Sequence, residues 1–99
     1  MSYHCFISEY ATQEIASAQK WYDEKEDGRG DKFWEAIFRK IDLLKQTPMM
    51  HALWKKNYRR GKVKDYPYSV YYTLGTKSIE IIAVLHDHQD IDSILKNRS

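Results

Sequence analysis

The chain has 99 residues, which is enough for one hydrophobic core and too few for two. Its hydrophobic fraction of 42% and charged fraction of 30% are those of a globular protein. It has no run of about 20 apolar residues, as a membrane span needs, and no apolar export signal near its start. Cys5 is the only cysteine, so no internal disulfide can form. We therefore expect one cytoplasmic domain over residues 1–99, with its core at about 3–90 and a tail at 91–99.

The net charge is only +2, but it is unevenly distributed. No acid occurs between Asp42 and Asp65, and that window contains seven bases, which we call the basic strip. The basic strip consists of Lys45, Lys55, Lys56, Arg59, Arg60, Lys62 and Lys64. Such a cluster attracts nucleic acid or an acidic protein segment, although a solvated surface of lysines and arginines is the simple alternative.

The first half of the chain predicts a strand followed by two helices. "YHCFIS" (3–8) alternates as a short strand does, and Ser8 can cap the helix that follows it. Apolar residues then recur at helical spacing until "DGRGD" (27–31), where Gly28 suits the left-handed position after a helix. Ala11, Ile15, Ala18 and Tyr22 lie on one face of this first predicted helix.

The second predicted helix has a wide apolar stripe and ends at Thr47-Pro48. The stripe consists of Phe33, Trp34, Ile37, Phe38, Ile41 and Leu44. The short link between the helices predicts an antiparallel hairpin. We expect its apolar side, including Ile15, Ile37, Phe38 and Ile41, to be buried against a sheet.

The second half of the chain has the period of strands. "HALWKKNYRR" and "GKVKDYPY" predict two strands with a turn near Arg60-Gly61. "SVYYTL" and "SIEIIAVLH" predict two more, joined by the short loop "GTK". Tyr66-Pro67-Tyr68 predicts a bend, a bulge or a strand entrance, because proline cannot donate to a ladder. The tail "DIDSILKNRS" could form one short helical turn, but it has no strong periodicity.

These elements predict an α+β fold in which a mostly antiparallel, twisted sheet is covered on one face by the helical hairpin. The N-terminal strand must join the sheet beside a later strand. The opposite face is expected to remain open. Strict alternation places Ile79, Ile81, Ala83 and Leu85 on the helix side of the last strand, and it leaves His86 near the open face with the basic strip.

Four segments in order resemble the RelE/ParE superfamily, the toxins of bacterial type II toxin–antitoxin systems, once called plasmid stabilisation proteins. They are "FISEYATQEI", "WYDEKEDGRGDKFWEAIFRKIDLLKQTP", "YRRGKVKDYPYSVYYTL" and "IEIIAVLHDHQD", and they span about residues 3–90. The resemblance implies a cytoplasmic protein that inhibits growth, forms a toxin–antitoxin hetero-oligomer with a co-expressed antitoxin, and has no membrane partner.

The superfamily divides by target. RelE-like members cleave messenger RNA on the ribosome without a metal, whereas ParE-like members inhibit DNA gyrase. Cleavage through the 2′-hydroxyl needs a proton acceptor, a proton donor and cations on the phosphate. In a RelE-like protein, Arg60, Lys62 and Lys64 would hold phosphate, and His86 or His88 would move protons. We expect no metal or other cofactor in either case.

In a ParE-like protein, the same basic surface would bind a protein target. Arg59, Arg60, Lys62 and Lys64 are the candidate target-binding or phosphate-binding cations, and Tyr71 or Tyr72 could stack on a base. The residues after His86 favour the ParE-like alternative, because the family often has arginines there and this chain has Asp87 and Asp90 instead. A degenerate homologue that is neither toxic nor catalytic is the third alternative.

Overall fold

A computed structural model describes residues 3–98 and contains three helices and five strands within that range. In chain order they are β1 (His4–Ile7), α1 (Glu9–Lys25), α2 (Arg29–Gln46), β2 (Leu53–Lys55), β3 (Tyr58–Lys62), β4 (Tyr68–Gly75), β5 (Ser78–His86) and α3 (Ile91–Lys96). The five strands form one sheet in the order β1-β5-β4-β3-β2. β1 is parallel to β5, and the other pairs are antiparallel. The predicted α+β fold is thus confirmed.

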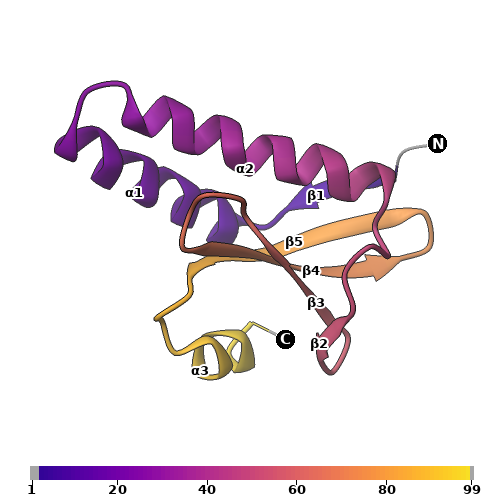
Figure 1. The fold of residues 1–99 in the computed structure, drawn as a ribbon. Helices are drawn as coiled ribbons and strands as arrows, with labels where there is room; N and C mark the ends of the chain where they lie inside the picture. The colour runs from indigo at the N-terminus through magenta and orange to yellow at the C-terminus, as the bar shows by residue number, and fades with distance from the viewer. Residues whose placement is uncertain (1–2, 99) are drawn as a thin grey trace.

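The helical hairpin is defined by local signals that were visible in the sequence. The Ser8 hydroxyl accepts a hydrogen bond from the backbone N–H of Ala11 at 3.0 Å, so Ser8 caps α1. Gly28 has a φ of +90°, a left-handed conformation that glycine adopts without a steric penalty. Figure 1 shows α1 and α2 side by side along one face of the sheet.

The core has two parts, one on each side of the sheet. The larger part lies between the helical hairpin and the sheet, and the smaller part lies between the sheet and α3. The expectation of an open second face is wrong, because α3 covers part of it (Figure 1). Leu95 of α3 is 3% exposed and packs with Tyr58, Tyr71, Ala83 and Leu85.

The expected turn near Arg60-Gly61 is also wrong. The chain turns at Lys56 and Asn57, and Gly61 lies inside β3, paired with Val70. Lys56 has a positive φ of 52°, which is the conformation that the first residue of a two-residue hairpin loop adopts. Tyr66-Pro67-Tyr68 is the entrance to β4, which begins at Tyr68.

A bulge reverses the expected faces in the second half of β5. Tyr71 pairs with Ala83 and Tyr72 pairs with Ile81, so Ile82 is an extra residue on β5. Ile79, Ile81 and Val84 therefore face the helical hairpin, whereas Ala83 and Leu85 face α3.

Burial on α2 corrects one further expectation. Ile37 and Ile41 are buried, as is Ile15 on α1, but Phe38 is only half-buried and stacks on the exposed Trp34 at 4.3 Å between ring centroids. Phe33, 0% exposed, is the aromatic residue of α2 that enters the core.

Candidate functional site

The two faces of β3 divide the basic strip. Arg60 points toward the α3 side, where its guanidinium lies 5.6 Å from the centroid of the Trp54 ring. Arg59 donates a hydrogen bond of 2.6 Å to the carbonyl oxygen of His51, in the segment that follows α2. Neighbouring strand residues point to opposite faces, so the strip is not one continuous surface.

Acids from the C-terminal segment pair with two bases of the strip. Lys62 Nζ lies 2.9 Å from Asp87 Oδ2, and Lys55 Nζ lies 3.0 Å from Asp92 Oδ1. Asp87 Oδ1 also accepts a hydrogen bond of 3.0 Å from the Ser69 hydroxyl. Burial alone would raise the pKa of Asp87, but hydrogen bonds from Lys62 and Ser69 outweigh it and hold that pKa below its usual value. A phosphate approaching Lys62 would therefore meet an ionised carboxylate.

The structure does not bring His86 and His88 together with Arg60. Because of the bulge in β5, His86 lies on the side of α1, and its ring packs edge-on against Tyr68 at 5.2 Å. The backbone N–H of His88 donates to His86 Nδ1 at 3.1 Å, so the two histidines remain close to each other. The expected position of His86 beside the basic strip is wrong. No group of three histidine, cysteine, aspartate or glutamate side chains within residues 3–98 is arranged to hold a metal ion.

Tyr71 and Tyr72 are core residues, 1% and 0% exposed. Burial raises the pKa of Tyr71, and hydrogen bonding to Arg60 partly offsets that rise. The Tyr72 hydroxyl donates to the carbonyl oxygen of Pro48 at 2.8 Å. Stacking of a base needs a free ring face, and neither buried ring offers one.

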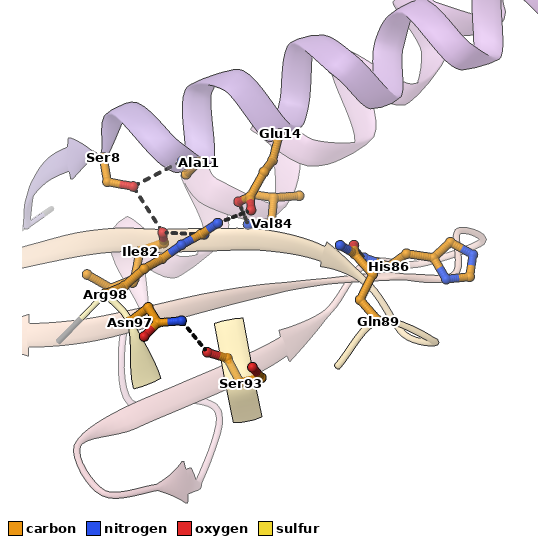
Figure 2. Close-up of polar contacts among 10 residues, drawn as sticks. All are labelled: Ser8, Ala11, Glu14, Ile82, Val84, His86, Gln89, Ser93, Asn97 and Arg98. Carbon is orange, nitrogen blue, oxygen red and sulfur yellow. Dashed lines mark hydrogen bonds and ion pairs between the residues drawn. The ribbon is translucent and has the colours of Figure 1, made fainter. Parts of the chain in front are cut away.

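The edge of β5 beyond the end of β1 is covered by side chains, as Figure 2 shows. The Glu14 carboxylate accepts from the backbone N–H of Val84 at 3.0 Å and lies 2.6 Å from the Arg98 guanidinium. The Ser8 hydroxyl and Arg98 both donate to the carbonyl oxygen of Ile82. Sequence analysis missed this network, because its members are separated by 70 or more positions in the chain or lie in the expected tail.

A basic groove of about 800 Å³ lies between α2 and the segment that joins β3 to β4. Its charged lining consists of Arg29, Lys32, Arg39, Lys40, Lys62 and Lys64, with the acids Glu26, Glu35 and Asp65. Its apolar lining consists of Tyr22, Ala36, Leu43 and Tyr66. The basic strip supplies Lys62 and Lys64, and α2 supplies the other four bases. Positions 29, 32, 36, 39, 40 and 43 share one helix face, which is the signal that could have found this groove in the sequence.

None of the helices within residues 3–98 is long and apolar enough to cross a membrane.

Comparison with known proteins places the chain in a family. The family described as "ParE toxin of type II toxin-antitoxin system, parDE" matches residues 6–91. A chain of the chromosomal ParDE toxin–antitoxin system from P. aeruginosa has the same fold, with a TM-score of 0.77 and 15% identity over 86% of this chain and 96% of that one. No curated protein matches the chain significantly. The chain therefore belongs to the ParE toxin family of type II toxin–antitoxin systems.

Proposed function

We propose that this protein is a growth-inhibiting toxin that acts on DNA gyrase in the bacterial cytoplasm by binding rather than by cleaving RNA. Membership of the ParE toxin family supports a toxin. The observation that carries the choice of target is the pairing of Asp87 with Lys62, together with the separation of His86 from Arg60. A ribonuclease needs free cations at the phosphate and a proton-transfer group on the same side of it.

An inhibitor that works by binding needs only a recognition surface. Arg60 is exposed on the α3 side and is already held by Trp54, so little side-chain entropy is lost when it contacts a partner. Arginines of this kind are frequent hot spots, worth about 2 kcal/mol or more on truncation to alanine.

We further propose that the toxin is held inactive by a co-expressed antitoxin with an acidic segment that binds the basic groove, and that the pair serves plasmid stabilisation. Six bases against three acids in the groove give the charge complementarity. Added salt should therefore slow association of the pair, which a stopped-flow measurement would follow.

A supercoiling assay with purified gyrase tests the proposed target. Purified protein should inhibit supercoiling by gyrase, and Arg60→Ala should weaken inhibition about 30-fold, the equivalent of 2 kcal/mol. Two controls are His86→Gln and Lys20→Ala, which changes an exposed lysine of α1, and neither should alter inhibition by more than about twofold.

Mapping of messenger 5′ ends after expression separates the alternatives. New codon-phased ends with unaffected supercoiling, lost in His86→Gln, would establish a RelE-like nuclease instead. A folded protein freed of its antitoxin that affects neither supercoiling nor messenger would be a degenerate homologue.

A further inference from the structure

Lys40 and His51 form a pair of nitrogen bases at the wall of the basic groove. Lys40 Nζ lies 2.8 Å from His51 Nε2, and both side chains are half-buried. Lys40 also lines the groove, so a small molecule in the groove can reach it. Neither residue has a place in the gyrase or antitoxin proposal beyond the charge that Lys40 gives to the groove.

The pair has no carboxylate within ion-pair distance among residues 3–98, unlike Lys55 and Lys62. Burial lowers the pKa of the Lys40 amine. Burial and the neighbouring charge of Lys40 lower the pKa of His51. A lysine that is not stabilised by an acid has a larger neutral fraction near neutral pH, and the neutral amine is the nucleophile.

Three segments hold the two side chains in contact. Lys40 comes from α2, and His51 comes from the segment after α2. The backbone carbonyl oxygen of His51 accepts a hydrogen bond of 2.6 Å from Arg59. Gly61 of β3 lies beneath both, since a Cβ atom there would be 3.0 Å from Lys40 Cε and 3.1 Å from His51 Nε2. The bare backbone of Gly61 therefore makes room for the pair, and the Nζ–Nε2 contact depends on the tertiary structure.

We propose that Lys40 is an acylation site that reacts with small acyl phosphates, with His51 as the proton acceptor. The groove contributes Arg39 and Lys64, which attract the anionic phosphate end of such a molecule. Neutral Lys40 Nζ attacks the carbonyl carbon, and the carbon–oxygen bond to phosphate breaks. Phosphate leaves with the bonding electron pair, and His51 Nε2 takes the proton from Nζ and passes it to water. The product is a neutral amide, so the groove loses one of its six bases.

The test uses the full chain and acetyl phosphate at neutral pH, with acetylation of each lysine followed over time by peptide mass spectrometry. Lys32 is the matched control, since it lines the same groove but is exposed and has no histidine partner. Lys40 should react at least about threefold faster than Lys32, because burial lowers the pKa of the Lys40 amine and the neutral amine is the nucleophile.

A His51→Gln variant separates proton acceptance from position, because glutamine can accept a hydrogen bond from Lys40 but cannot take its proton. In this variant the rate at Lys40 should fall, because the proton acceptor is lost, and the rate at Lys32 should not change. Circular dichroism checks that the variant folds, and the comparison within the wild-type protein stands without it. Equal rates at Lys40 and Lys32 in the wild-type protein would overturn the proposal, as would an unchanged Lys40 rate in a folded His51→Gln variant.

Discussion

Replacing Phe33 with alanine should destabilise the protein more than replacing either of the other aromatic residues of α2. The Phe33 ring is 0% exposed and lies at the centre of an aromatic cluster. Its centroid is 5.0 Å from those of Tyr22 and Tyr68 and 5.3 Å from that of Tyr66. This cluster joins both long helices to the entrance of β4, so the loss of one ring loosens three elements.

The magnitude follows from burial and from ring geometry. Truncation of a buried phenylalanine to alanine costs about 3–5 kcal/mol, and each well-oriented aromatic pair contributes about 0.5–1.5 kcal/mol beyond its buried area. We therefore expect Phe33→Ala to lie near 5 kcal/mol, at the upper end of the first range. Phe38 is half-buried against Trp34, so Phe38→Ala should cost about 0.8–1.5 kcal/mol, roughly half of the transfer free energy of a fully buried ring.

Urea unfolding followed by far-ultraviolet circular dichroism measures both free energies, provided that the variants share one m-value. A domain of this size has a total stability of about 5–15 kcal/mol, so the loss expected for Phe33→Ala is enough to unfold the protein at the lower end of that range. Phe33→Leu is the milder substitution for that case, and it should still cost more than Phe38→Leu. A larger loss for Phe38 than for Phe33, in either pair of variants, would refute the assigned face of α2.

Three other outcomes are expected. Glu14→Ala should cost about 1–3 kcal/mol in urea unfolding, because it leaves the Val84 N–H without an acceptor, whereas alanine at the exposed Glu24 should cost almost nothing. Asp87 has a lowered pKa, so its contribution to stability is complete above the unfolded-state value near 3.8 and is lost as the pH falls through the lower folded-state value. Asp87→Asn should therefore reduce the fall in melting temperature between about pH 5 and pH 2, and an unchanged fall would contradict the role given to this carboxylate. Leu95→Ala should cost about 2–3 kcal/mol and raise hydrogen exchange in α3 and at the sheet residues beneath it; unchanged exchange there would mean that α3 does not depend on this contact.

The sequence alone determined the elements whose signals are local. Ser8 and Gly28 mark the start of α1 and the turn after it, and Pro48 follows the end of α2, because caps and breakers act within one helical turn. The β-branched and aromatic residues of β4 and β5 likewise predicted the two longest strands. The order of these elements was enough to suggest the superfamily to which the family match belongs.

The tertiary structure alone decided which side chains meet. One extra residue, Ile82, moves Ala83, Leu85 and His86 to the faces opposite to those that strict alternation predicts, and nothing in the local pattern marks a bulge. The tail has too weak a period to predict a helix, and α3 is stabilised by Leu95 against a sheet face formed far away in the chain.

The surface charges depend on tertiary structure for the same reason. The basic strip is free of acids in the sequence, but Asp87 and Asp92 approach Lys62 and Lys55 from more than 20 positions away once the chain folds. The contact between Lys40 and His51 likewise requires α2 and the segment after it to meet over the bare backbone of Gly61. Charge and periodicity along the chain report the neighbours of each residue in sequence, whereas pairing, pKa and reactivity are set by its neighbours in space.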